Sequence, residues 1–515
     1  MFRGLRNIGR LLTVARTLAR HRALAPFAEH IEGAGLAPAI LLIARLFTRG
    51  DAAKGRPGER LTAALIDLGP VFIKFGQLLS TRSDILGEEV TADLSRLQDR
   101  LPPFAGSLAR AMVAGELGQP VDVMFSSFED EPVSAASIAQ VHYAVTSEGE
   151  PVAVKVLRPG IEAAFARDLD LMFWIAEWIE RSQPRLRRFK PLAVAETFRA
   201  MCRVELDLRL EGAAAAELAQ NFEGDPTYRV PKIDWRRTTR RVLTLERLTG
   251  IPMDDRQAML DARLDIDLVL ARAAAIFFKQ AFRDGFFHGD QHPGNMFVDE
   301  AGNIAAVDFG IMGRLDRKTR YYLADMLLGF LERDYLRVAE VHFAARFVPA
   351  HQSREDFTQA CRSIGEPIFG RPLAEISFAN VLGQLLRLSE SFEMEAQPQL
   401  LLLQKNMLMA EGISRQLNPN LNIWTLAQPL VEAWMRENRG PEARISQAAH
   451  DIVGIAGRIP DLVSEMEAAA ATIARGGVKL HPDTLGAFAR ANGRGQGWLI
   501  WLAIGALALM LIFSR

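Results

Sequence analysis

The chain has 515 residues, enough for two or three domains with a large core, and its 61 basic and 62 acidic residues nearly cancel. This balance lacks the positive field of a nucleic-acid-binding protein, so we expect no nucleic-acid partner. The two cysteines, Cys202 and Cys361, cannot form a disulfide framework and fit a reducing compartment.

Residues 1–54 begin with a basic segment that predicts an amphipathic helix. The first 22 residues contain six arginines and no acid, with Leu, Ile, Phe and Val interleaved. Such a helix is typical of a membrane surface, and a mitochondrial transit peptide has a similar composition. A helix packed on the protein body explains the same pattern.

Residues 55–118 predict a helical extension, with helices near 59–68, 70–81 and 88–99. The second helix carries Lys74-x-Gly76-Gln77, and Lys74 and Gln77 share one face. Gly76 costs a helix about 1 kcal/mol relative to alanine, which indicates a close backbone approach there. An ordinary amphipathic helix with a solvated polar stripe is the alternative.

Residues 119–250 predict a small β-rich lobe. Strands are expected at 133–145, 151–157 and 241–248, and helical patterns at 160–179 and 191–218 form an insertion between them. Residues 251–440 are mostly helical in pattern. We therefore expect an α+β fold with two lobes and a ligand in the cleft between them.

The β-rich lobe also carries a set of charged residues that suit a nucleotide. Lys155 lies in the middle of a strand, where a kinase-type site places the lysine that holds the α and β phosphates. Its acidic partner is expected on the helix that follows, with Glu211 favoured and Glu205 second; Asp207 is the third acid there. Glu246 ends a strand where a hinge that binds the adenine edge belongs.

Residues 288–310 contain the most informative spacing in the chain. Asn295 follows Asp290 by five residues, and Asp308 of an Asp-Phe-Gly follows Asn295 by thirteen. In kinase-type sites this spacing gives one catalytic carboxylate and two Mg²⁺ ligands around ATP phosphates. We therefore predict Asp290 as the catalytic group and Asn295 and Asp308 as metal ligands, with ATP and Mg²⁺ as cofactors. A turn between strands with a chance Asp-Phe-Gly is the alternative.

Three features depart from an ordinary protein kinase. The glycine-rich loop over the phosphates is replaced by an alanine-bearing loop, whose Cβ atoms disfavour positive φ. This loop consists of Val133, Ser134, Ala135, Ala136, Ser137, Ile138, Ala139, Gln140 and Val141. Gly289 replaces the Arg of His-Arg-Asp, and only five residues separate Gly310 from the helix expected at Asp316. A site for docking a protein substrate is therefore disfavoured.

The C-terminal part predicts a connection to a membrane. Residues 441–497 are expected to hold an amphipathic helix and a linker, and residues 498–513 carry no charge. A helix of this length spans about 24 Å, short of a bilayer core of roughly 30 Å. We still predict a C-terminal transmembrane anchor, and Arg490 and Arg494 favour a folded body on the cytoplasmic side. A buried helix or a homodimer contact is the alternative.

Five motifs in order resemble the UbiB-type atypical kinase family, which is associated with ubiquinone biosynthesis. They are Lys74-x-Gly76-Gln77, the Ala-Ala-Ser-Ile-Ala-Gln-Val-His loop, Glu205-x-Asp207, His288-Gly289-Asp290 and Asp308-Phe309-Gly310. The resemblance covers residues 55–440 and implies a protein-kinase-like fold. It also implies that the Lys-x-Gly-Gln helix covers the cleft, with Lys74 and Gln77 facing Glu205 and Asp207.

The resemblance implies a membrane-associated, Mg²⁺-dependent, kinase-like ATPase that supports ubiquinone synthesis. Its expected partners are membrane lipid, polyprenyl-phenol or quinone intermediates and other ubiquinone biosynthesis proteins. The expected location is the bacterial inner membrane, with the mitochondrial inner membrane as the alternative. A non-catalytic nucleotide-binding scaffold and a small-molecule kinase are the competing functions. Direct hydroxylation of the quinone ring is not supported, because the sequence has neither a dinucleotide-binding motif nor the spacing of iron ligands.

Overall fold

The computed structural model describes residues 2–23, 55–80, 86–94, 101–182, 187, 190–367, 384, 388–389, 391–394, 398–421, 426, 429–430 and 432–436. The chain divides into two compact units, Met1–Trp434 and Met435–Arg515, and the elements below belong to the first. Over the described residues, no helix is both long enough and apolar enough to cross a bilayer. The segments expected at 441–497 and 498–513 lie outside the described residues.

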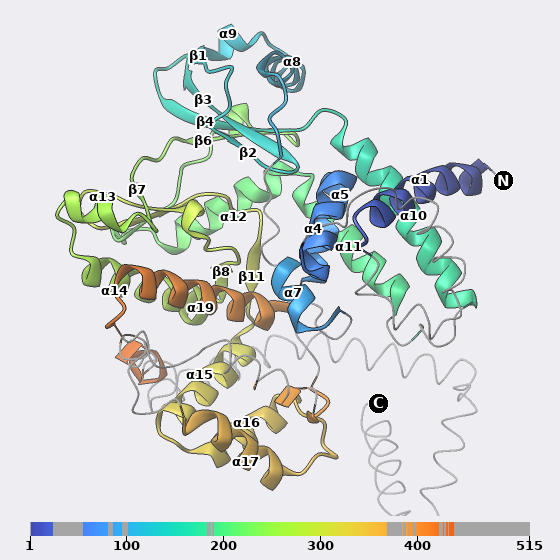
Figure 1. Ribbon diagram of the computed structural model, residues 1–515. Helices are drawn as coiled ribbons and strands as arrows, with labels where there is room; N and C mark the ends of the chain where they lie inside the picture. Colours follow the sequence, from blue (N-terminus) through green and yellow to red (C-terminus); the bar gives the residue numbers. More distant parts are fainter. Residues whose placement is uncertain are drawn as a thin grey trace, which may run out of the picture. The chain divides into compact units, whose positions relative to one another are not determined.

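The β-rich lobe is one antiparallel sheet in the order β1-β3-β4-β6, with β2 paired to β3 (Figure 1). Its strands are β1 (Phe125–Phe128), β2 (Ser134–Ala135), β3 (Ala139–Thr146), β4 (Pro151–Leu157) and β6 (Val242–Glu246). Alternation along β4 places Val152, Val154 and Val156 in one core cluster, together with residues of α8 (Gly106–Leu117) and α9 (Val121–Met124). Lys155 therefore lies on the opposite face of the sheet.

The other face is covered by helices from the extension and the insertion. These are α4 (Pro57–Leu68), α5 (Pro70–Leu79), α7 (Glu88–Leu94), α10 (Ile161–Ser182), α11 (Pro191–Glu205) and α12 (Leu208–Asn221). One hydrophobic cluster joins Ile73 of α5, Leu157 of β4 and Phe198 of α11. The extension is therefore part of the core of this lobe.

The helical pattern predicted at 191–218 is confirmed, but it forms two helices, because the chain breaks between α11 and α12. Asp207 adopts an extended backbone and its carboxylate accepts a hydrogen bond from the Arg209 N–H. This cap begins a new helix.

The basic N-terminal helix α1 (Phe2–Arg20) packs on the insertion, as one of its two expected placements requires. Arg10 donates two hydrogen bonds to buried Asp168 of α10, at 2.7 and 2.8 Å. Ile8 and Leu12 stay exposed on the outer face of the helix.

The second lobe combines short strands with helices. The sheet order is β5-β10-β9-β7, from β5 (Tyr228–Arg229), β7 (Ile251–Pro252), β9 (Met296–Val298) and β10 (Ile304–Ala306). A separate ribbon pairs β8 (Phe286–His288) with β11 (Met312–Arg314). The strands expected next to Asp290, Asn295 and Asp308 are thus confirmed.

Helices complete this lobe. They are α13 (Arg256–Asp261), α14 (Ile266–Phe278), α15 (Arg317–Leu331), α16 (Tyr335–Ala344), α17 (Arg354–Gly365) and α19 (Pro398–Leu417). A π-helical turn, η4 (Lys279–Asp284), leads into β8, and α19 runs beside α14 and β11 (Figure 1). The α15 helix begins directly after its cap Asp316, which confirms the short connection from Gly310.

Candidate active site

Lys155 of β4 connects the two lobes through a pair of carboxylates. Its Nζ lies 2.7 and 3.0 Å from the two oxygens of Glu211 on α12, and 3.0 Å from Oδ1 of Asp308. The Lys155 and Glu211 side chains are 13% and 8% exposed. The ion pair predicted between Lys155 and Glu211, across 56 residues of sequence, is therefore present.

The charges of Lys155, Glu211 and Asp308 shift one another's pKa values. Burial opposes the charge on Lys155, but Asp308 and Glu211 raise its pKa above the usual range. The Lys155 ammonium holds the pKa of Asp308 far below its usual value, against the effect of burial. Burial raises the pKa of Glu211 to about 7, while Lys155 opposes that rise. At neutral pH the site therefore offers a charged lysine beside an ionised Asp308.

His288 fixes the segment that carries Asp290. Burial lowers the pKa of His288, so its ring is neutral at pH 7. Its Nε2–H donates to the Val307 carbonyl at 3.3 Å, and its Nδ1 accepts from the Asp290 N–H at 3.1 Å. The ring also packs edge-on against Phe309, with centroids 5.5 Å apart. One buried imidazole thus couples the Asp290 segment to the Asp-Phe-Gly.

The two predicted metal ligands, Asn295 and Asp308, belong to the two segments that His288 connects. Asn295 ends a short 3₁₀ turn, and its amide donates to the Asp290 carbonyl at 3.2 Å. Asp308 has a left-handed backbone, with φ of 64°, and its side chain is 49% exposed. This conformation is costly for a residue with a Cβ, which is typical of functional sites. One carboxylate oxygen and one amide oxygen are ligands that fit Mg²⁺ when phosphates complete its coordination.

The alanine-bearing loop comprises β2, a tight turn at residues 136–138 and the start of β3. The Ala136 N–H donates to the Ala139 carbonyl at 2.8 Å, and Arg158 donates to the Ala136 carbonyl at 2.8 and 3.1 Å. Gln140 is fully buried, and its side chain bonds both backbone groups of Phe104. The Gln140 side chain therefore ties the extension to the sheet, and the contact of this loop with nucleotide stays a prediction.

The predicted gating residues are brought together in part. Lys74 of α5 lies 3.0 Å from Glu205 at the end of α11, and both side chains are almost fully buried. The charge of Lys74 also lowers the pKa of Asp308, so α5 acts on a predicted metal ligand. Asp207 instead caps α12 and pairs with Arg209 at 2.6 Å. Gln77 is half-buried on α5, one residue beyond buried Gly76.

Glu246 lies where the sequence placed the connection between lobes. It is the last residue of β6, and the chain enters β7 of the second lobe at Ile251. Its carboxylate pairs with Arg229 and accepts from the Lys232 N–H at 3.2 Å. The side chain thus fixes the hinge, and only its backbone neighbours stay candidates for an adenine edge.

Two residues of α19 reach this site, and neither was predicted. Lys405 Nζ lies 2.7 Å from Oδ1 of Asp290. The Asn406 amide donates to the His288 carbonyl, and its oxygen accepts from the Gln291 N–H at 3.3 Å. The signal in the sequence was a Lys-Asn pair inside a long apolar run.

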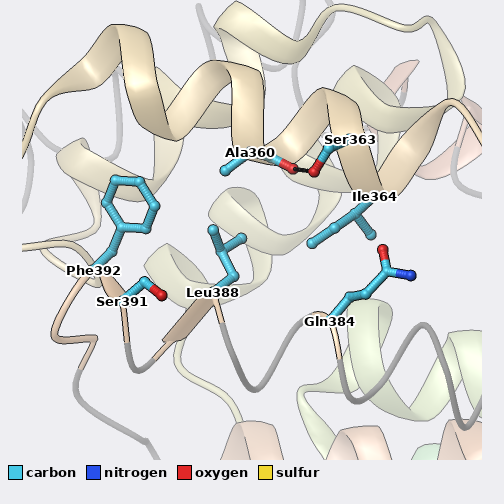
Figure 2. Close-up of a pocket in the computed structure, with 7 residues that line it drawn as sticks. All are labelled: Ala360, Ser363, Ile364, Gln384, Leu388, Ser391 and Phe392. Carbon is cyan, nitrogen blue, oxygen red and sulfur yellow. Dashed lines mark hydrogen bonds between the residues drawn. The ribbon is translucent and has the colours of Figure 1, made fainter.

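A hollow of about 260 Å³ lies elsewhere in the second lobe, between α17 and the segment near residue 388 (Figure 2). Ser363 donates there to the Ala360 carbonyl at 2.7 Å, and Leu388 and Phe392 supply apolar walls. Among the described residues, its lining is Ala360, Ser363, Ile364, Gln384, Leu388, Ser391 and Phe392, which carry no charge.

Comparison with known proteins agrees with this geometry. The family of the ABC1 atypical kinase-like domain matches residues 96–342, and that of the UbiB helical domain matches residues 361–422. The fold and site thus define an atypical kinase-like protein. The relative from Marinobacter nauticus, "Probable protein kinase UbiB", is 45% identical over 75% of this chain and 72% of its own length. A relative of the same name from Pseudomonas putida is 44% identical over 79% and 77%. The chain belongs to the UbiB family.

A solved structure shares the fold. It is the complex of Rv3197 with erythromycin from Mycobacterium tuberculosis, which is 26% identical to this chain with a TM-score of 0.51. The match covers 72% of this chain and 94% of that one.

Proposed function

We propose that this protein is a membrane-associated, ATP-binding atypical kinase or ATPase that supports ubiquinone biosynthesis. The observation that carries the proposal is the position of Lys155, which contacts Glu211 and Asp308 at the same time. A charged lysine held by one helical and one Asp-Phe-Gly carboxylate is the arrangement that binds ATP phosphates in kinases. The name of the relatives, "Probable protein kinase UbiB", supports the assignment to ubiquinone synthesis.

Each residue of the proposed site has its own role in ATP turnover. Asn295 and Asp308 would hold Mg²⁺, which neutralises phosphate charge when bound. Lys155 orients the α and β phosphates. Asp290 takes the proton from an attacking water or alcohol as its oxygen bonds to the γ phosphorus and the bond to the ADP oxygen breaks.

Water or a small acceptor suits this site better than a protein chain. Five residues between Gly310 and Asp316 leave little surface on which a peptide could dock. The buried Lys74–Glu205 ion pair holds α5 against the insertion beside the site. ATP turnover would then serve to mobilise polyprenyl-phenol intermediates or to regulate other enzymes of the pathway.

Membrane association is the part of the proposal that rests on the sequence. The uncharged residues 498–513, with the exposed Ile8 and Leu12 on the outer face of α1, support contact with an inner membrane, with the body on the cytoplasmic side. Membrane lipid and polyprenyl-phenols are the partners proposed.

The test is ADP release by the detergent-solubilised full chain, with and without a polyprenyl-phenol and anionic lipid. We expect lipid to stimulate turnover in wild type, Asp290→Asn to lower it by about 100-fold or more, and Lys74→Ala to alter the stimulation. Equal ADP release by wild type and Asp290→Asn would contradict a catalytic function.

A genetic test distinguishes a non-catalytic scaffold from an ATPase. Asp290→Asn should fail to restore ubiquinone in a deficient bacterium, because the scaffold needs no catalytic carboxylate but the ATPase does. Restoration by Asp290→Asn would favour the scaffold. Phosphate transfer to added alcohols would instead favour a small-molecule kinase, which the short connection after Gly310 also suits.

A further inference from the structure

The segment around Asp290 receives support from a helix more than 100 residues away in sequence. Lys405 Nζ contacts the Asp290 carboxylate at 2.7 Å, and Asn406 contacts the backbone on both sides of Gly289 and Asp290. Asn406 is fully buried, whereas Lys405 is 49% exposed. Two adjacent residues of α19 thus hold the side chain and the main chain of one segment.

The helix that carries this pair is itself fixed at its other end. Arg256 donates to the Leu417 carbonyl at 2.9 Å, Gln416 to the Asp254 carbonyl at 3.0 Å, and Asn418 to Asp267 at 2.6 Å. Because α19 is held at its end and packs on α14 and β11, it presents Lys405 from a rigid element.

The Lys405–Asp290 ion pair is partly exposed, so a contribution to folding stability does not explain it. Partly exposed pairs contribute about 1 kcal/mol or less. A catalytic carboxylate, by contrast, loses rate when its position changes by about 1 Å. The neighbouring residue Gly289 has no side chain that could hold Asp290, so the cation comes from α19.

We propose that Lys405 and Asn406 position the catalytic segment, so that the UbiB helical domain completes the active site. Lys405 orients the Asp290 carboxylate through one N–H, and Asn406 fixes the backbone of residues 288–291. The proposal rests on the proposed catalytic function of Asp290.

A double-mutant cycle on ATP turnover tests Lys405. We expect Lys405→Met to lower kcat about 10- to 100-fold, with nucleotide affinity changed less than about twofold. Lys405→Arg should recover part of kcat. Adding Lys405→Met to Asp290→Asn should cause little further loss, because both changes act through one carboxylate.

Lys279→Met supplies the matched control. Lys279 pairs with Asp225 at 2.6 Å and is 40% exposed, similar to Lys405 in length of contact and exposure. Both variants should keep a melting temperature within about 4 °C of wild type, but only Lys405→Met should lose kcat. Full activity of Lys405→Met, beside an inactive Asp290→Asn, would overturn this inference and leave the proposed function intact.

Amide hydrogen exchange gives a second readout that does not depend on turnover. Asn406→Ala and Lys405→Met should each raise exchange in residues 288–292, and Lys279→Met should not. If wild type does not hydrolyse ATP, the proposed function fails, but the exchange result still decides positioning. Unchanged exchange in both α19 variants would contradict the positioning role.

Discussion

At the scale of single residues, the site depends on charges that are partly removed from water. Lys155 and Glu211 are nearly buried and in direct contact, so each compensates the other's lost hydration. The arrangement also explains why Glu211, rather than Glu205, is the partner of Lys155: Glu205 is turned to Lys74. Two lysine–glutamate pairs thus connect the sheet, the insertion and the extension.

Removing Lys155 should destabilise the protein in a way that depends on pH. In Lys155→Met we expect the free energy of unfolding to fall by about 3–5 kcal/mol at pH 8, because Glu211 stays buried without its cation. The raised pKa of Glu211 means that the unfolded chain ionises it more readily, so the loss should shrink as pH falls toward 5. Chemical denaturation measures both effects. Lys155→Met/Glu211→Gln should recover most of the loss; no recovery would contradict the pairing.

Gly289 is required by close contact with the strand ribbon. Its N–H donates to the Ile311 carbonyl at 2.8 Å, and a Cβ would lie 2.9 Å from Ile311 Cγ2 and 3.0 Å from that carbonyl oxygen. Gly289→Ala should therefore lower the free energy of unfolding by about 1–3 kcal/mol. Gly412→Ala on α19 meets no atom within 4 Å and should be neutral or stabilising by about 1 kcal/mol. Similar effects in both variants, measured by denaturation, would refute the steric explanation.

At the scale of elements, helices from the N-terminal third form part of the lobe that holds Lys155. The apolar faces of α4 and α5 share a core cluster with β4 and α11, so the extension cannot be removed without exposing that core. The α1 helix packs on the same cluster through half-buried Val14 and Leu18, and its Arg10 forms an ion pair with buried Asp168.

The Arg10 contact should control whether α1 stays docked. Arg10→Ala leaves buried Asp168 with Arg167 as its cation, and we expect faster hydrogen exchange throughout α1. Arg16→Ala, at an exposed position of the same helix, should leave exchange near that of wild type. Equal exchange in the two variants would show that the ion pair does not hold α1.

At the scale of the whole molecule, buried histidines should make stability depend on pH. Burial lowers the pKa of His142 in the β-rich lobe and of His342 in α16. Both are neutral when folded, so their contribution is complete above the unfolded pKa of about 6.5 and is lost as pH falls below it. His342→Phe should reduce the slope of unfolding free energy against pH, between 5 and 6.5, by up to about 1.4 kcal/mol per unit. An unchanged slope, with His351→Gln as the exposed control, would contradict this.

The sequence predicted the parts of the molecule whose signals are local. Strand alternation and the spacing of Asp290, Asn295 and Asp308 predicted the two lobes and the strands beside the catalytic segment. The contact of Lys155 with Glu211 followed from the kinase pattern. The break at Asp207 was missed because helix periodicity continues on both sides of that cap.

Contacts between distant segments could not be predicted in the same way. Lys405 and Asn406 lie in an apolar helix, and only its docking beside β11 brings them to Asp290. Gln140 looked like a residue of a phosphate loop, but the fold turns its amide to Phe104. All three residues act through tertiary packing, which leaves no short motif in the sequence.

In the proposed function, Asp290, Lys155 and Asp308 together turn over ATP. Its most direct test is release of labelled phosphate from γ-labelled ATP by wild type and Asp290→Asn, with ATP affinity measured in parallel. We predict Mg²⁺-dependent release by wild type, and release lowered by about 100-fold or more in Asp290→Asn at similar affinity. Equal release from the two proteins would contradict it.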